Sequence, residues 1–228
     1  MTGHDVAIAS LKIDSPPATL RKLALHRLRG AIVAGTFEPG TRLVERTLGD
    51  QLGVSRSVVR EVIRHLETEG LIEMAKNGPI VALLDWNEAR QIYDIRALLE
   101  SAAVADCATR ADAAVKAELA SILGDLDRAA SDREPGAMLE ATIEFYAAIF
   151  TNSGHEIAWE IVSRLNSRIS RLRVMTLATA NRTVSGPARL RQILEAIERN
   201  DSETAAAACR EHIAEAASIA ATMLATPL

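Results

Sequence analysis

The fold is decided by the stretch from Val54 to Gly70, VSRSVVREVIRHLETEG. Ser55 is suited to cap a helix, and Arg56, Arg60 and Arg64 follow at intervals of four residues, so they share one face of that helix. The opposite face is apolar and consists of Val58, Val59, Val62, Ile63 and Leu66. A short amphipathic helix with arginines in its first turns suits the DNA major groove, where arginine binds guanine edges or phosphates.

The residues around this helix predict a winged helix-turn-helix over residues 18–84. A helix is expected from Thr19 to Ala34 and a second, shorter one from Arg46 to Leu52. The helix after Ser55 is the third. Extended runs follow on both sides of a glycine-bearing loop and predict a hairpin, and one further short strand is expected; these segments are Leu71–Met74, Pro79–Ala82 and Thr41–Val44. Residues 1–17, which end at Pro16-Pro17, are expected to form a flexible arm.

Residues 85–228 predict a second domain, an all-helical bundle of about six helices. Asp85 and Glu88 have the spacing of a capping box, so a helix begins there. Helices are then expected at about 86–110, 111–130, 135–151, 156–178, 187–200 and 202–225. No strand pattern interrupts them, so the chain is mainly α. A bundle of this kind is a common site for a ligand cavity and a dimer contact.

Composition and charge narrow the function further. The chain is 48% hydrophobic and 3% aromatic, with a net charge of -4. Residues 1–84 hold 11 Lys and Arg against 9 Asp and Glu, whereas the rest hold 15 against 21. A slightly basic first domain on an acidic second one argues against a non-specific nucleic-acid coat protein and permits sequence-specific binding.

The sequence also indicates where the protein works. Cys107 and Cys209 lie in alanine-rich helical segments and are expected to be buried free thiols in a reducing compartment. No apolar run is long enough to span a membrane, and the N-terminus lacks a signal pattern. We therefore expect a cytoplasmic protein without membrane contact.

Several motifs carry a family resemblance. The first domain contains Gly35-x-Phe37-x-Pro39-Gly40-x-x-Leu43, Leu52-Gly53-Val54-Ser55-Arg56, Val59-Arg60-Glu61 and Leu66-x-x-Glu69-Gly70-Leu71-Ile72. It closely resembles the DNA-binding domain of GntR-type bacterial transcription regulators. The second domain contains Tyr93-x-x-Arg96-x-x-x-Glu100, Phe145, Ile193-Leu194-x-Ala196-Ile197 and Asp201. It resembles the ligand-sensing FCD domain of the FadR subfamily, and six helices rather than seven resemble its shorter, VanR-like branch.

The resemblance implies a set of DNA-contacting residues and a mode of binding. The implied contacts are Arg46, Ser55, Arg56, Ser57 and Arg60, with Gly78 at the tip of the wing. Arg42 and Lys76 are weaker candidates for contact with the DNA backbone. The resemblance also implies a homodimer on a two-fold symmetric operator in double-stranded DNA. The alternative for the arginines is that they only solvate the outer face of a helix.

Many sensors of the FadR type hold a divalent metal with one aspartate and three histidines, and this chain departs from that pattern. Thr142 stands at the aspartate position, Tyr146 and Leu190 stand at two histidine positions, and His212 alone is retained. One imidazole cannot hold a metal that needs three or four ligands. We therefore expect a metal-free sensor without a cofactor.

The expected effector is a small molecule, in particular an organic acid, because carboxylates favour bidentate arginine. The candidate contacts are Arg96, Thr142, Tyr146, Arg164, Arg168 and His212, and Arg171 and Arg173 lie on the same predicted helix. Three alternatives stay open. Tyr146 and His212 could simply fill the space of the lost metal. Arg164, Arg168 and Arg171, which share one face, could be a solvated basic stripe that pairs with acids on another helix. Arg96 with Glu100 could be a structural ion pair.

These residues favour a ligand-responsive DNA-binding regulator, a repressor, whose operator affinity changes when the bundle binds its effector. The alternative is a constitutive DNA-binding regulator whose bundle only dimerises. An enzyme is not expected, because the sequence has no nucleophile–base pair, no glycine-rich phosphate loop and no metal set.

Overall fold

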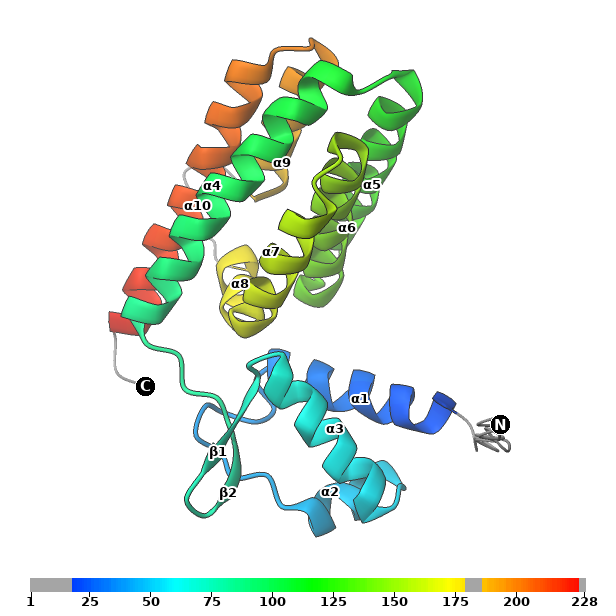
Figure 1. The fold of residues 1–228 in the computed structure, drawn as a ribbon, viewed down its shortest axis with the longest axis vertical. Coiled ribbons are helices and arrows are strands. Elements are labelled where there is room, and N and C mark those ends of the chain that lie inside the picture. Colours follow the sequence, from blue (N-terminus) through cyan, green and yellow to red (C-terminus); the bar gives the residue numbers. More distant parts are fainter. Residues whose placement is uncertain (1–17, 179–185, 226–228) are drawn as a thin grey trace, which may run out of the picture.

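The computed structural model describes residues 18–178 and 186–225, so the predicted N-terminal arm lies outside the described residues. Two units are stacked end to end (Figure 1). The lower unit, called the head, contains α1 (Ala18–Val33), α2 (Glu45–Leu52), α3 (Arg56–Thr68) and the hairpin of β1 (Ile72–Ala75) with β2 (Gly78–Val81). Its elements are the predicted winged helix-turn-helix.

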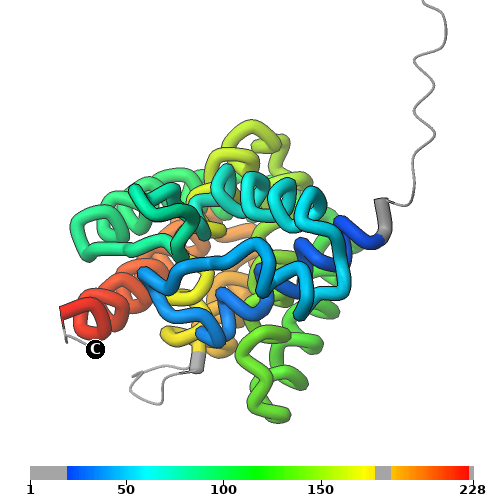
Figure 2. Tube along the Cα trace, turned by 90° about the horizontal axis from the view of Figure 1, so that it is seen from below, coloured from blue at the N-terminus to red at the C-terminus, as the bar shows by residue number. Residues whose placement is uncertain are grey.

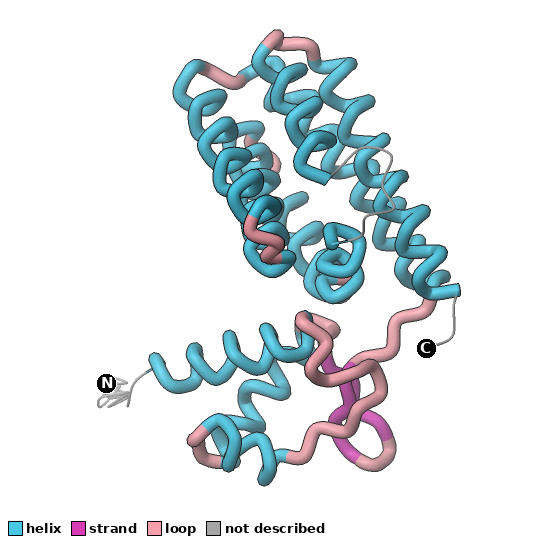
Figure 3. The backbone as a smooth tube through the Cα atoms, turned by 180° about the vertical axis from the view of Figure 1, so that it is seen from behind, coloured by secondary structure: helices cyan, strands magenta, loops and turns pink. Residues whose placement is uncertain are grey.

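The upper unit, called the bundle, is helical throughout its described part. It contains α4 (Trp86–Arg110), α5 (Ala113–Ser131), α6 (Pro135–Ser153), α7 (Glu156–Arg168), α8 (Ser170–Ala178), α9 (Gly186–Glu198) and α10 (Ser202–Ala225). Helices α4 and α10 run side by side, and α5 pairs with α6 (Figure 1). Strands occur only in the head among the described residues, as Figure 3 shows.

Local sequence signals account for several element boundaries. Asp85 caps α4, because its Oδ1 accepts a hydrogen bond of 2.8 Å from the Glu88 backbone N–H, as its spacing predicted. Gly53 and Gly70 have φ of +66° and +72°, values that favour glycine, and they end α2 and α3. The hairpin pairs β1 and β2 antiparallel with Ile72 opposite Val81.

Two expectations about the fold were wrong. The short strand at Thr41–Val44 is only a single bridge between Arg42 and Ile80. The helix expected over 156–178 is divided at Ile169, where φ is -103° and ψ is 12°, so the described bundle has seven helices rather than six. Seven bundle helices therefore do not support the expected resemblance to the shorter, VanR-like branch, which was based on six.

Each unit has its own apolar core. In the head, α3 contributes Val59, Val62, Ile63 and Leu66, all nearly inaccessible to solvent, and α1 packs on it through Leu28. In the bundle, Phe145 and Phe150 of α6 are fully buried. Figure 2, a view from the head end, shows the head elements in front of the bundle helices. The head core positions the exposed residues at the free end of the head, and the bundle core surrounds a separate set of buried residues.

Candidate functional site

The first turn of α3 is an exposed, polar helix N-terminus. The Ser55 Oγ accepts a hydrogen bond of 3.4 Å from the Val58 backbone N–H, so the predicted cap is confirmed. The Ser55 and Ser57 hydroxyls lie 2.8 Å apart. Both serines and Arg56 are exposed. Hydroxyls and backbone N–H groups at a helix N-terminus are suited to bind phosphate.

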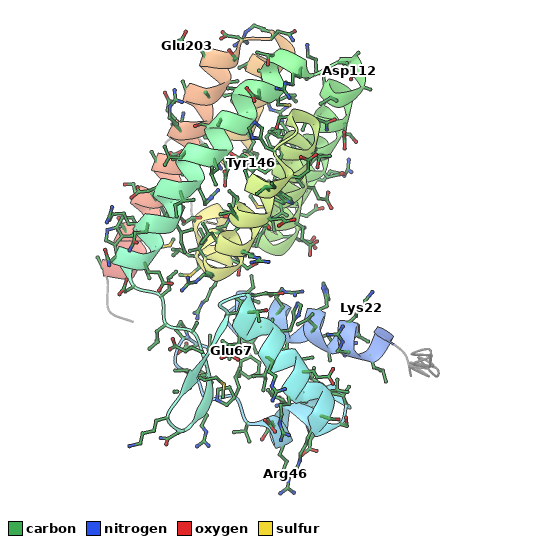
Figure 4. All side chains as sticks on the ribbon, in the orientation of Figure 1. Lys22, Arg46, Glu67, Asp112, Tyr146 and Glu203 are labelled. Carbon is green, nitrogen blue, oxygen red and sulfur yellow. The ribbon has the colours of Figure 1, made fainter. Side chains whose placement is uncertain are left out.

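Exposed arginines surround this turn. Arg56, Arg60 and Arg64 lie on the face of α3 opposite its buried side chains. Arg46, the second residue of α2, projects from the lower end of the molecule (Figure 4). The free end of the head therefore presents exposed arginines around the N-terminal turn of α3.

Arg60 is already engaged by a carboxylate, Glu45, which the sequence did not predict as its partner. Its Nε and Nη2 donate to Glu45 Oε1 and Oε2 at 3.0 and 2.8 Å, which is a bidentate pair between α3 and α2. The hydrogen bond from Arg60 holds the pKa of the Glu45 carboxyl below its usual value. Arg60 must therefore leave or share Glu45 in order to bind a base edge.

The wing positions Arg42 next to Gly78. Gly78 begins β2 with a φ of +110°, and a Cβ at this position would lie 3.9 Å from Arg42 Nε. Lys76 is exposed in the turn that precedes it. The cation beside Gly78 is therefore Arg42, which comes from the segment before α2.

The bundle encloses a buried charged cluster. Arg96 and Glu100 of α4 are 2% and 0% exposed, and Arg96 Nε and Nη2 donate to the Glu100 carboxylate at 2.7 and 3.2 Å. The guanidinium also lies 5.4 Å from the centre of the Tyr93 ring. Burial opposes the charge of Arg96, but the Glu100 carboxylate outweighs it and raises the pKa of Arg96. The expected i,i+4 ion pair is therefore formed inside the protein.

A second buried arginine makes this cluster cationic. Arg173 of α8 is 5% exposed, and its Nη1 has no hydrogen-bond partner among the described residues. Burial and the neighbouring Arg96 lower the pKa of Arg173 to about 10, so it is still protonated at neutral pH. Among the described buried residues, Glu100 is the one acidic side chain. The cluster thus holds two guanidiniums and one carboxylate, which is bonded to Arg96.

Tyr146 and His212 lie together in the bundle, as the resemblance implied. Their rings are 6.5 Å apart and nearly parallel, and the Tyr146 hydroxyl lies 3.7 Å from the Cys209 sulfur (Figure 4 labels Tyr146). Burial raises the pKa of Tyr146 well above its ordinary value, so the phenol stays neutral. Thr142, one turn earlier on α6, donates its hydroxyl to the Met138 carbonyl at 2.8 Å.

These donors do not fit a divalent metal. Thr142 uses its hydroxyl within its own helix, Tyr146 is held neutral, and the buried Leu190 has no ligand atom. No three His, Cys, Asp or Glu side chains gather in a ligating group within residues 18–178 and 186–225. His212 is left as one imidazole where three or four ligands are needed.

Two of the predicted effector contacts lie outside the cluster. Arg164 is exposed on α7, and Arg168 donates to Glu88 at the start of α4 and lies over Gly70 of the head. The break at Ile169 explains why these two arginines lie outside the cluster. The helix face that Arg164 and Arg168 share does not continue into α8. Arg171 lies beside Gly35 of the head, whereas Arg173 enters the bundle core.

Both cysteines are buried free thiols, as expected. No helix in the described part of the chain is long and apolar enough to cross a membrane.

Comparison with known proteins gives two family matches that divide the chain as the structure does. Residues 20–81 match the model of bacterial regulatory proteins of the gntR family, and residues 91–215 match the FCD domain. An HTH-type transcriptional regulator of Agrobacterium vitis is 36% identical over 107 residues, which are 46% of this chain and 62% of that protein. The chain thus matches less than two thirds of the length of this relative.

Two further relatives match along most of the chain. The HTH-type transcriptional repressor RspR of Escherichia coli is 26% identical over 206 residues, 88% of this chain and 89% of that protein. The solved structure of E. coli McbR/YncC has a TM-score of 0.73 at 23% identity and covers 90% of this chain and 98% of that one. At this identity the solved structure supports the fold alone.

Proposed function

The chain belongs to the GntR family of bacterial regulatory proteins that carry an FCD domain, and we propose that it is a repressor controlled by a small organic acid. The family makes it a DNA-binding transcription regulator. The repressor role, the effector, the homodimer and the two-fold symmetric operator are the proposed parts. The name of the E. coli relative, a repressor, supports the first of them. We also propose that the protein has no enzymatic activity and that it acts in the cytoplasm, where its operator DNA lies.

The observation that carries DNA binding is the exposed first turn of α3 with its flanking arginines. Arg56 would read base edges in the major groove, while Ser55 and Ser57 with the helix N-terminus would hold phosphates. Arg46 and the wing at Gly78 would bind the backbone on either side. Arg60 would exchange Glu45 for the DNA.

The test is a gel shift with the DNA that flanks the protein's own gene, since regulators of this kind often control neighbouring genes. Arg56→Ala and Arg60→Ala should each weaken specific binding by roughly 5- to 150-fold, the worth of one bidentate base contact. Arg64→Ala is the matched control, because Arg64 is exposed on the same helix but farther from its N-terminus. Equal affinity of the wild type and both variants would remove α3 as the reading helix.

The observation that carries the effector is the excess positive charge of Arg96 and Arg173 over Glu100. A buried charge without a partner is costly, so an anion that reaches Arg173 Nη1 gains more here than it gains at the surface. The carboxylate of an organic acid supplies this charge and accepts two parallel hydrogen bonds from a guanidinium. Tyr146 and His212 would contact the remainder of the effector.

A metal-free sensor remains our proposal, because the donor set at Thr142, Tyr146, Leu190 and His212 does not fit a metal. Arg173 would supply a positive charge in the bundle without a metal. Elemental analysis of the purified protein tests this point, and a stoichiometric transition metal would contradict it.

Thermal denaturation with a panel of monocarboxylates tests the effector site. An effector at 100 times its dissociation constant stabilises the wild type by about 2.7 kcal/mol. Arg173→Met should raise the Tm of the ligand-free protein, because it removes an uncompensated buried charge, and should abolish stabilisation by acids. Stabilisation of Arg173→Met equal to that of the wild type would refute the site. If no acid stabilises the wild type while operator binding is intact, the constitutive regulator is favoured.

The homodimer is supported by exposed apolar side chains on two neighbouring helices. Leu98 of α4 is 73% exposed and Ile157 of α7 is 77% exposed, and Ile95 and Ile161 lie one turn from them. Burying such side chains in a second copy gives the hydrophobic gain that drives association. Leu98→Glu and Ile157→Glu should shift the protein to a monomer in light scattering. A dimer that both variants retain would exclude this face.

A further inference from the structure

The head and the bundle line a cavity of about 620 Å³ between them, which is partly open to solvent. Its floor is one face of α1 in the head, and its walls belong to α6, α7 and α8 of the bundle. Figure 1 shows α7 and α8 at the end of the bundle that faces α1. The volume is within the range of small-molecule sites, roughly 300–1,000 Å³. The cavity is separate from the charged cluster, since Arg96, Glu100 and Arg173 do not line it.

The walls are largely apolar. Leu139, Ile143, Trp159 and Val174 face the cavity from the bundle, and Val33 faces it from α1. Trp159 is also packed against Phe150, with ring centres 5.4 Å apart, which fixes its position in the wall. A mostly apolar molecule with an aromatic or aliphatic body matches this lining.

Two buried polar atoms in the wall have no protein partner among the described residues. The Asn166 Oδ1 and the Ser170 Oγ both lack one, although these side chains are 6% and 9% exposed. They lie on either side of the break at Ile169, at the end of α7 and the start of α8. A carboxamide oxygen accepts a hydrogen bond, and a hydroxyl can donate one. Both atoms are shielded from solvent, so a ligand with one donor and one acceptor meets them once these side chains turn toward the cavity.

The ionisable side chains of the lining are His26, Arg29 and Glu140, and they do not make the wall cationic. Arg29 of α1 lines the cavity, and its Nε already donates to Glu69 Oε2 at 2.9 Å. Arg29 is thus engaged by Glu69, and Glu140 adds a carboxylate to the lining, so an anionic ligand is disfavoured here. Glu69 is the C-cap residue of α3, so this wall is joined directly to the helix with the exposed arginines.

We propose that this cavity is a second ligand site, which binds a small uncharged molecule with an apolar body and a primary amide or similar donor–acceptor group. The amide N–H donates to Asn166, and its carbonyl accepts from Ser170. The ligand contacts both α1 and α8, and thereby biases the placement of the head on the bundle. The site is independent of the organic-acid site at Arg173.

Trp159 fluorescence with benzamide as the probe tests this proposal. Trp86→Phe leaves Trp159 as the only tryptophan of the two in the chain. Benzamide should change its emission saturably. Asn166→Leu and Ser170→Ala should each weaken binding roughly fivefold, the worth of one hydrogen bond. Ser131→Ala is the matched control, since Ser131 lies at the end of α5 and does not line the cavity, so this variant should leave binding unchanged.

Gly30→Leu gives a variant that fills the cavity without breaking the fold. Gly30 lines the cavity within α1, and a Cβ at this position meets no atom within 4 Å. Leucine is also the better helix former. This variant should remove benzamide binding while its Tm stays at or above that of the parent. No saturable signal, or equal affinity of Gly30→Leu and the parent, would overturn the proposal.

Arg173→Met separates this site from the organic-acid site. It should bind benzamide like the parent and show no response to benzoate. Loss of benzamide binding in Arg173→Met would mean that the probe occupies the charged cluster, which would also overturn the second site.

Discussion

Gly70→Ala should destabilise the protein more than the same change at Gly53, because the Arg168 side chain of the bundle lies against Gly70. Gly70 has a φ of +72°, and a Cβ on it would lie 2.5 Å from Arg168 Cγ and 2.9 Å from Arg168 Nε. Alanine therefore forces Arg168 away from α3 and from its partner Glu88. Gly53, with a φ of +66°, has no atom within 4 Å of an added Cβ.

The two glycines thus form a matched pair. Gly53→Ala should cost about 1–2 kcal/mol, the strain of a left-handed conformation with a Cβ. Gly70→Ala should cost the same strain plus roughly 0.2–1 kcal/mol for the half-exposed Arg168–Glu88 ion pair. For a chain of this length each kcal/mol lowers Tm by about 2–4 °C.

Thermal denaturation followed by circular dichroism of Gly53→Ala, Gly70→Ala, Arg168→Ala and Gly70→Ala/Arg168→Ala measures the coupling as a double-mutant cycle. The excess cost at Gly70 should vanish in the Arg168→Ala background, where no side chain meets the new Cβ. The reasoning is refuted if Gly53→Ala and Gly70→Ala lower Tm equally, or if the excess persists without Arg168.

Two further predictions concern the head and the bundle core. Glu45→Gln should tighten operator binding in a gel shift, because it frees Arg60 for DNA; weaker or equal binding would show that Glu45 orients Arg60 instead. Burial raises the pKa of the Cys107 thiol from 9.0 to about 11, so the unfolded chain loses this proton before the folded one and stability should fall as pH rises from 9 to 11. Urea denaturation across this range should show a flatter decline for Cys107→Ala, and an equal decline would assign it to other groups.

The parts of the fold that depend on local chemistry were predictable from the sequence. The cap at Ser55, the end of α3 at Gly70 and the hairpin each depend on residues a few positions apart, and the structure has all three. The apolar stripe of α3 is likewise a local pattern, and its predicted core residues Val59, Val62, Ile63 and Leu66 are buried.

The features that were missed depend on tertiary geometry. Glu45 meets Arg60 across 15 positions because of the angle between α2 and α3, which no spacing rule gives. The break at Ile169 has neither glycine nor proline beside it, so periodicity continued the helix and kept Arg164 and Arg168 with the cavity residues. Arg173 could be named from its position on that helix, but its burial near a second cation, Arg96, could not.

The break between α7 and α8 constrains how the sequence of this segment can change. Arg168 contacts the head and Arg173 enters the charged cluster, so six residues hold both ends in register. Deleting or inserting one residue between them would rotate α8 by about 100° relative to α7 and turn Arg173 out of the core. We expect relatives that share this cluster to vary in residue type here while the length of the segment stays fixed.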